Sequence, residues 1–336
     1  MASSLHFRAG QVFFALLWFC RTVDAQNIAP VYLNPPDQNP YGSGFSSGVN
    51  SHGQVAGYYQ KSGEQSYTLF AWQNGNILVT QPLDNFGSTG AINDVGQVVI
   101  GDNGGVPPQI WQNGIYKALP TVTHLAVATG INNQGEVPGC EVAIASQIDF
   151  FYIPASVVWK NYRLTRVGLQ GDAIRSCANG INNSGQVVGY TRTGPFSTGY
   201  LADNGTVTNI VAGNVTSAYA INDSGQVVGS FYNAVAAGSG PQKAFLWQNG
   251  ASQELTPPGT TQNAAISIDS QGRVLISSNA NSDGWVWKNG TFFHLDQVYR
   301  VSSISSVGSG AIVAGACRNV LPEGGTLAVP CIWNVP

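Results

Sequence analysis

The sequence predicts an all-β protein, a seven-bladed β-propeller of four-stranded antiparallel blades. Three observations carry this prediction: a phrase that recurs along the chain, a second phrase that alternates with it, and a composition suited to strands and tight turns. The 336 residues include 41 Gly, 17 Pro and one Met. Only 9% of them are charged, against about 25% in typical domains. Gly and Asn favour turns and aromatic residues favour strands, so a helical bundle is disfavoured.

The first 25 residues have the pattern of a secretory signal peptide. An apolar run from Val12 to Cys20 is followed by a small residue, Ala25, which places cleavage before Gln26. A run of this length is shorter than the roughly 20 residues that cross a bilayer, and a buried N-terminal strand is the alternative interpretation. We expect a signal peptide over 1–25 and a single propeller domain over 26–336, secreted to the extracellular space or periplasm without a membrane span.

The first repeated phrase is an apolar residue, Asn, two small or polar residues, Gly and an apolar strand, as in INDSGQVVG from Ile221. Its central positions are Gly53, Gly96, Gly135, Gly185, Gly225 and Gly272, with Ala311 in a worn seventh copy. Positions 53 and 311 are six intervals apart, which gives a mean period of 43 residues. Repeats of this length are typical of propeller blades.

The second phrase is an apolar pair ending in Trp, followed by a polar residue, Asn and Gly. Its Trp positions are Trp72, Trp111, Trp159, Trp247, Trp287 and Trp333, with Ala202 replacing Trp once. From each of these positions to the next repeat Gly the distance is 23–26 residues, whereas from Gly to Trp it varies from 15 to 24. The constant interval indicates packed structure, and the variable one indicates a surface loop.

Each phrase predicts a tight turn. In the first, Asn begins a type I turn and Gly supplies the left-handed residue that closes it, while Asn-Gly in the second is a strong hairpin signal. The repeat Ala218–Pro257 therefore predicts four strands: Ala218 to Asn222, Gln226 to Tyr232, Lys243 to Gln248, and Ala251 to Thr256. One four-stranded sheet cannot bury both faces, so blades must stack, and we interpret the recurrent Trp as a packing residue between blades.

The seventh blade lacks a fourth strand, because only three residues follow Trp333. The segment Ile28 to Asn34 resembles the fourth strands and precedes the first repeat, so we predict that it completes the last blade and joins the two chain ends.

Four cysteines remain after cleavage, an even number that favours disulfides in an exported protein. Cys317 and Cys331 fall on the second and third strands of the last blade, and we favour their pairing. Cys140–Cys177 would then connect blade three to blade four. Four cysteines allow three connectivities.

The alternation of I-N-x-x-G-Q-V-V-G with F-L-W-x-N-G resembles the HAF family of bacterial extracellular repeat proteins. The resemblance covers nearly the whole mature chain, and it implies export and a propeller-like fold. It carries no catalytic residues to transfer. The chain departs from the pattern at Ala202, at Tyr162 where Gly is expected, and in the worn seventh copy.

Few residues suggest chemistry. Each repeat turn offers at most one carboxylate (Asp94, Asp223 or Asp269), whereas a calcium site takes six to eight oxygens, so we expect neither a metal site nor a cofactor. The histidines His52, His124 and His294 are scattered. With 14 basic and 17 acidic residues and no basic cluster, nucleic acid is excluded as a partner.

Binding is the remaining activity. Aromatic residues follow the second strands at Tyr58, Tyr59, Tyr190, Phe231 and Tyr232, and among Asn and Gln they would suit a neutral glycan. Ordinary blade packing is the alternative reading. The strands before each repeat Asn, such as Ser88-Thr89-Gly90 and Ser217-Ala218, would give the central channel a small, neutral lining.

Three functions follow from these observations. The favoured one is a secreted, non-catalytic interaction or surface-associated scaffold, monomeric, whose partner is an extracellular glycan or protein. The second is a lectin with repeated sites between blades. The third is a glycan-active hydrolase or lyase at the channel mouth, which would require two carboxylates, or a His with an acid, at one end of the channel.

Overall fold

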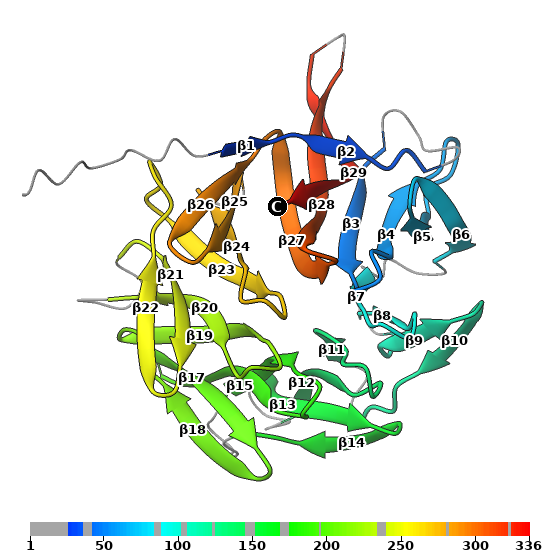
Figure 1. Cartoon of the computed structure of the whole chain (residues 1–336). Coiled ribbons are helices and arrows are strands. Elements are labelled where there is room, and N and C mark those ends of the chain that lie inside the picture. The colour runs from blue at the N-terminus through cyan, green and yellow to red at the C-terminus, as the bar shows by residue number, and fades with distance from the viewer. Residues whose placement is uncertain are drawn as a thin grey trace, which may run out of the picture.

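A computed structural model of the chain describes residues 26–35, 42–83, 89–101, 106–122, 125–144, 152–168, 175–194, 196–233, 240–279, 282–321 and 324–336. The predicted signal peptide lies outside these residues. The described strands form seven sheets that surround a central axis, which confirms the predicted seven-bladed propeller (Figure 1).

The strands follow the chain in blade order. Blade 1 contains β3 (Gly44–Val49), β4 (Val55–Gln60), β5 (Tyr67–Gln73) and β6 (Asn76–Pro82). Blade 2 contains β7 (Thr89–Ile92), β8 (Val98–Ile100), β9 (Gln109–Gln112) and β10 (Ile115–Ala118). Blade 3 contains β11 (Ala126–Ala128), β12 (Val137–Ile144), β13 (Tyr152–Lys160) and β14 (Arg163–Arg166). Blade 4 contains β15 (Arg175–Ile181), β16 (Val187–Thr193), β17 (Phe196–Asp203) and β18 (Thr206–Ile210).

The remaining blades involve both ends of the chain. Blade 5 contains β19 (Val215–Ile221), β20 (Val227–Tyr232), β21 (Lys243–Gln248) and β22 (Ala251–Leu255). Blade 6 contains β23 (Asn263–Ile268), β24 (Val274–Ser278), β25 (Asp283–Lys288), β26 (Thr291–Leu295) and β1 (Gln26–Ile28). Blade 7 contains β27 (Val298–Val307), β28 (Gly310–Val320), β29 (Thr326–Val335) and β2 (Pro30–Tyr32).

Both predicted turn types are present. The six repeat glycines, Gly53 to Gly272, have φ between 71° and 78°, a conformation that Gly adopts without strain. The Asn-Gly turns place two residues at positive φ, as at Asn74 (50°) and Gly75 (86°), which is the pattern of a type I′ hairpin. We call the side of the propeller that carries both turns the turn face. The opposite side, with the loops between second and third strands, is the loop face.

The worn seventh copy has a shorter turn than the other six. β27 and β28 are joined by two residues, Gly308 and Ser309, and Val307 pairs with Gly310. Ala311, which aligns with the repeat glycines, therefore lies in β28 and not in a turn.

The hydrophobic core is divided among the blade interfaces. Each of the seven buried clusters in the described residues contains side chains from two neighbouring blades. Trp72, for example, packs with Ala314 and Ile332 of blade 7. All six repeat tryptophans are at most 8% exposed, as the packing interpretation predicts.

The two departures in the second phrase have local solutions. Where Ala202 replaces Trp, Tyr200 on the same strand is fully buried against blade 3, and its hydroxyl donates to Ser156 Oγ at 2.9 Å. Tyr162 takes the place of Gly at φ 57°, and its ring lies under Lys117, whose Nζ is 3.3 Å from the ring centroid. This cation–π contact accompanies a backbone conformation that is uncommon for residues other than Gly.

The N-terminal segment closes the ring, as predicted, but it does so through two strands. β2 pairs antiparallel with β29 as the fourth strand of blade 7. Just before it, β1 pairs parallel with β26 and adds a fifth strand to blade 6. Leu33, only 5% exposed, follows β2 and packs in the interface between blades 7 and 1. Residues 26–33, here called the N-terminal clasp, therefore join blade 6, blade 7 and the edge of blade 1.

Both favoured disulfides are present. Cys317–Cys331 bridges β28 and β29 within blade 7. Cys140–Cys177 joins β12 of blade 3 to β15 of blade 4. Each bond therefore joins the strands on which the order of the repeats placed its two cysteines.

Candidate functional site: the central channel

The inner strands of the blades surround two cavities, of about 290 Å³ and 240 Å³. Both are lined by six apolar residues at or shortly after the ends of the inner strands, which form a collar between them: Val49, Ile92, Ile131, Ile181, Ile221 and Ile268. The larger cavity lies on the loop-face side of this collar, and the smaller one is lined by the repeat turns.

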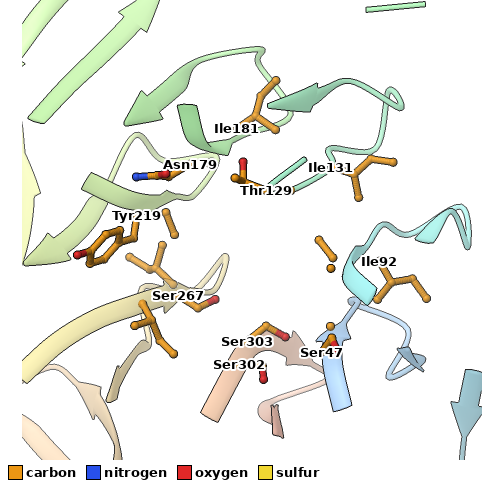
Figure 2. Close-up of a pocket in the computed structure, with 18 of the residues that line it drawn as sticks. Ser47, Ile92, Thr129, Ile131, Asn179, Ile181, Tyr219, Ser267, Ser302 and Ser303 are labelled. Atoms are coloured by element: carbon orange, nitrogen blue, oxygen red, sulfur yellow. The ribbon is translucent and has the colours of Figure 1, made fainter. Parts of the chain in front are cut away.

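The loop-side cavity has a small, uncharged wall (Figure 2). β-bulges interrupt several inner strands, and the residue that each bulge adds lines the cavity: Ser47, Asn179, Tyr219 and Ile266. The next residue is small because neighbouring inner strands approach closely. A Cβ on Gly180 would lie 2.9 Å from the carbonyl oxygen of Tyr219.

The predicted channel lining is displaced by these bulges. In blade 5 the lining residues are Tyr219 and Ala220, whereas Ala218 is fully buried inside the blade. In blade 2 Gly90 lines the cavity together with Ala91, and Ser88 lies outside the described residues. A bulge shifts the side-chain alternation by one residue, which the alternation pattern alone does not reveal.

The repeat asparagines form a hydrogen-bonded belt around the axis. In blades 1 to 5 the Asn side chain closes its own turn; in blade 1, for example, Asn50 Oδ1 accepts from the backbone N–H groups of His52 and Gln54, at 3.1 and 2.9 Å. Its Nδ2 then donates across the blade interface to the carbonyl oxygen of Asn93, at 2.9 Å. The same interblade bond links the succeeding pairs Asn93–Asn132, Asn132–Asn182, Asn182–Asn222 and Asn222–Asp269.

Blade 6 maintains the belt with different chemistry. Asp269 has no side-chain N–H to donate, and its carboxylate instead accepts from Arg273 Nη1 at 2.8 Å. Arg273 Nη2 donates across the interface to the carbonyl oxygen of Ser309 in blade 7, at 2.6 Å. Both side chains of this ion pair are completely buried. The link from blade 1 to blade 7 is made by Val49 N–H, which donates to Ser303 Oγ at 3.1 Å.

A second ring of polar side chains lines the turn-face mouth. Asp94 Oδ1 accepts from Ser51 N–H at 2.8 Å, and its Oδ2 accepts from Asn133 Nδ2 at 2.8 Å. Asp223 accepts from the backbone and side chain of Asn183 in the same way, at 2.7 and 2.8 Å. Partial burial raises the pKa of Asp94, but the hydrogen bonds from Ser51 and Asn133 outweigh it, and the pKa is lower than usual.

Asp94 and Asp223 therefore both line one mouth of the channel, the place where the enzyme hypothesis would put its carboxylates. They belong to blades 2 and 5, and both are engaged by neighbouring blades. A low pKa keeps Asp94 ionised, which suits a hydrogen-bond acceptor and not a general acid near neutral pH.

The five predicted binding aromatics have different environments. Tyr59 and Phe231 are 0% and 6% exposed and belong to the core between blades. Tyr58, Tyr190 and Tyr232 are half-buried. Of these three, Tyr58 lies in a larger aromatic group, because its ring centroid is 5.4 Å from Phe45 and 5.4 Å from Tyr67.

The two histidines of the described residues lie in different places. His52 is exposed in the repeat turn of blade 1, where its Nδ1 is 4.0 Å from Asp94 Oδ1 at the turn-face mouth, and His124 lies outside the described residues. His294 lies at the loop-face end of β26, where its Nε2 is 2.8 Å from Asp283 Oδ1 and its Nδ1 is 3.3 Å from Asp296 Oδ1. Its Nδ1 is also 3.2 Å from Asn27 Oδ1 in the clasp. This cluster joins β1 to blade 6.

Two kinds of feature do not occur among the described residues. These residues contain no group of three or more His, Cys, Asp or Glu side chains arranged to bind a metal ion. No helix with the length and apolar character needed to cross a membrane occurs among them.

Comparisons with known proteins give the fold alone. No family model matches the chain, and no curated protein matches it. Among solved structures, acylaminoacyl peptidase from Pyrococcus horikoshii aligns with 88% of this chain at 11% identity and a TM-score of 0.58. The chain spans about half of that enzyme, since the alignment covers 51% of it.

A second structure aligns over nearly its whole length. The β-propeller domain of the Trilobed protease from Pyrococcus furiosus has a TM-score of 0.56 and 10% identity, with 87% of this chain and 95% of that domain covered. That domain has an open Velcro topology. In this chain, by contrast, β2 joins β29 and closes the last blade.

Proposed function

We propose that this protein is an exported, non-catalytic interaction propeller that presents its loop face to an extracellular partner. The observation that carries the proposal is that the polar groups of the turn face make hydrogen bonds to neighbouring blades. The Asn belt, Asp94, Asp223 and the Asp269–Arg273 pair all bond to a neighbouring blade. These side chains maintain the ring, and the segments that vary among the repeats are the loops of the opposite face.

Two further observations support an exported binding protein. The disulfides favour a location outside the cytoplasm, because such bonds persist in oxidising compartments. The resemblance to HAF repeats and the signal-peptide pattern agree with export. The loop-side cavity, with its neutral wall of small and hydroxyl side chains, would suit an uncharged part of an extracellular partner.

The test combines binding with turnover. Purified protein beginning at Gln26 would be assayed against broad panels of glycans and of peptidase, esterase, lactonase and glycosidase substrates, and its mass in solution would be measured. We expect a monomer that binds without turnover. Turnover abolished by Asp94→Asn or Asp223→Asn in a folded variant would overturn the proposal and establish the channel-mouth enzyme instead.

A further inference from the structure

Four aromatic rings gather on the loop face where blade 7 meets blade 1. Phe45 of β3 lies 5.4 Å from Tyr58 of β4, with a tilt of 33° between the rings. Tyr67 of β5 meets Tyr58 edge-on at 5.4 Å, and Tyr299 of β27 lies 6.2 Å from Phe45. We call Phe45, Tyr58, Tyr67 and Tyr299 the Tyr58 cluster. It spans the joint between two blades that are far apart in sequence.

The cluster is partly exposed to solvent. Tyr299 is 43% exposed, and the other three residues are half-buried. Burial raises the pKa of Tyr58, and the nearby guanidinium of Arg300 only partly opposes this effect. The Tyr58 hydroxyl therefore stays neutral at physiological pH and can both donate and accept. The Arg300 side chain is exposed beside it.

The cluster continues into the loop-side cavity along the same strands. Phe45 is two residues before Ser47, and Arg300 is two residues before Ser302, and both serines line the cavity. Figure 2 shows Ser47, Ser302 and Ser303 on one side of the cavity, with Thr129 and Asn179 across it. An aromatic rim thus adjoins a wall of hydroxyl and amide groups.

The size of the cluster indicates a small ligand. Each aromatic side chain offers about 150–250 Å² of surface, so four rings that are mostly half-buried expose on the order of 200–300 Å². A stable protein interface buries about 800 Å² on each partner. One or two sugar rings match the smaller area.

We propose that the Tyr58 cluster binds a pyranose ring of a glycan chain, which stacks on the aromatic rim while its hydroxyls bond to the tyrosines, Arg300 and the cavity serines. This inference rests on the proposed function and names the ligand class of its loop face. A pyranose has apolar C–H faces and equatorial hydroxyls, so it complements aromatic faces beside neutral polar groups. Arg300 would donate to ring hydroxyls in a neutral glycan and to the carboxylate in a uronate.

The experiment uses an array of neutral and uronate-containing oligosaccharides, followed by calorimetry on the bound ones. We expect Tyr299→Ala to weaken binding at least about tenfold and Tyr58→Phe, which retains the ring, to weaken it less. Phe196→Ala is the matched control, because Phe196 is 46% exposed at the start of β17, where the loop face of blade 4 lies. Thermal melts would verify that all variants fold.

Arg300→Gln separates the two glycan classes. A loss confined to uronates identifies an acidic ligand, and an equal loss for both identifies hydroxyl recognition. The inference is overturned by a silent array, by binding that survives both Tyr299→Ala and Tyr58→Phe, or by an equal effect of Phe196→Ala. A silent array together with binding of a non-glycan partner would leave the proposed function standing, whereas turnover would overturn that function itself.

Discussion

The side-chain amide of Asn222 donates to the carbonyl oxygen of Asp269 across the interface of blades 5 and 6, at 3.0 Å. At Asp269 the series of amide donors ends, and the guanidinium of Arg273 replaces it as the donor to blade 7. The repeat Asn therefore has two roles, since it closes a turn within its blade and connects that blade to the next one.

The first prediction concerns this double role. Asn182 is 3% exposed, its Oδ1 accepts from Ser184 and Gln186, and its Nδ2 donates to Gln186 and Asn222. Asn182→Ala leaves several buried groups without partners, at about 1–3 kcal/mol each. We therefore expect the free energy of unfolding, measured by chemical denaturation, to fall by at least about 2 kcal/mol. Ser184→Ala, in the same turn but exposed, should change stability little. Equal losses for the two variants would contradict a stabilising role for the Asn belt.

The second prediction concerns the buried Asp269–Arg273 pair. Arg273→Gln alone leaves a buried carboxylate uncompensated and should cost about 3–5 kcal/mol. The double change Asp269→Asn with Arg273→Gln recreates the Asn–Gln pair of blade 5, where Asn222 Nδ2 bonds to Gln226 Oε1 at 2.8 Å. We expect it to recover most of the loss, also because Arg273 Nε has no hydrogen-bond partner among the described residues. A double variant as unstable as the single one would refute this explanation.

The third prediction concerns the N-terminal clasp. Removing residues 26–35 uncovers the outer edge of β29 and removes Leu33 from the interface with blade 1, so the melting temperature of the whole domain should fall. Removing 26–29 alone takes away only β1 and its contact with His294, and should cost less. Melting of a chain beginning at Gln26 supplies the reference. An unchanged melt for the longer deletion would show that the ring does not need the clasp.

The fourth prediction follows from the lowered pKa of Asp94. A carboxyl whose pKa is depressed by folding stabilises the native state above its unfolded pKa of about 4, and this contribution disappears as the pH falls through the folded value. Asp94→Asn should therefore be less stable than the wild type near neutral pH, with the difference shrinking toward pH 2–3. Denaturant midpoints measured across this range would show it. A difference independent of pH would contradict an ionised Asp94 in the ring.

The blade architecture could be predicted because each repeat contains the Asn and Gly residues that specify its own turns. In blade 5 the strands Lys243–Gln248 and Ala251–Leu255 agree with prediction to within one residue. β19 begins at Val215, three residues before the predicted Ala218, because only the turn that follows this strand carries a sequence signal. β1 escaped prediction altogether because three residues, Gln-Asn-Ile, have no periodicity that distinguishes a strand from a loop.

The site was less predictable for a physical reason. Tyr58 was identified from its place at a strand, but Tyr299, which joins the same cluster through Phe45, is 241 positions away and reaches the cluster only because the ring closes. The link between Asn182 and Asn222 was also missed, because turn chemistry explains the Asn fully within one repeat. Contacts between blades depend on the ring and not on the local sequence.

The direction of the Asn belt bears on how such a chain can grow. Each of blades 2 to 5 accepts a hydrogen bond on one side and donates one on the other, a head-to-tail contact of the kind that closes rings of identical subunits. A duplicated repeat would therefore already carry the donor and the acceptor for its hydrogen bonds to both neighbouring blades. Among the described residues, the joints of blades 6, 7 and 1 use individual contacts instead, those of Arg273, Ser303 and the clasp, and they are the place where the repeated array closes into a ring.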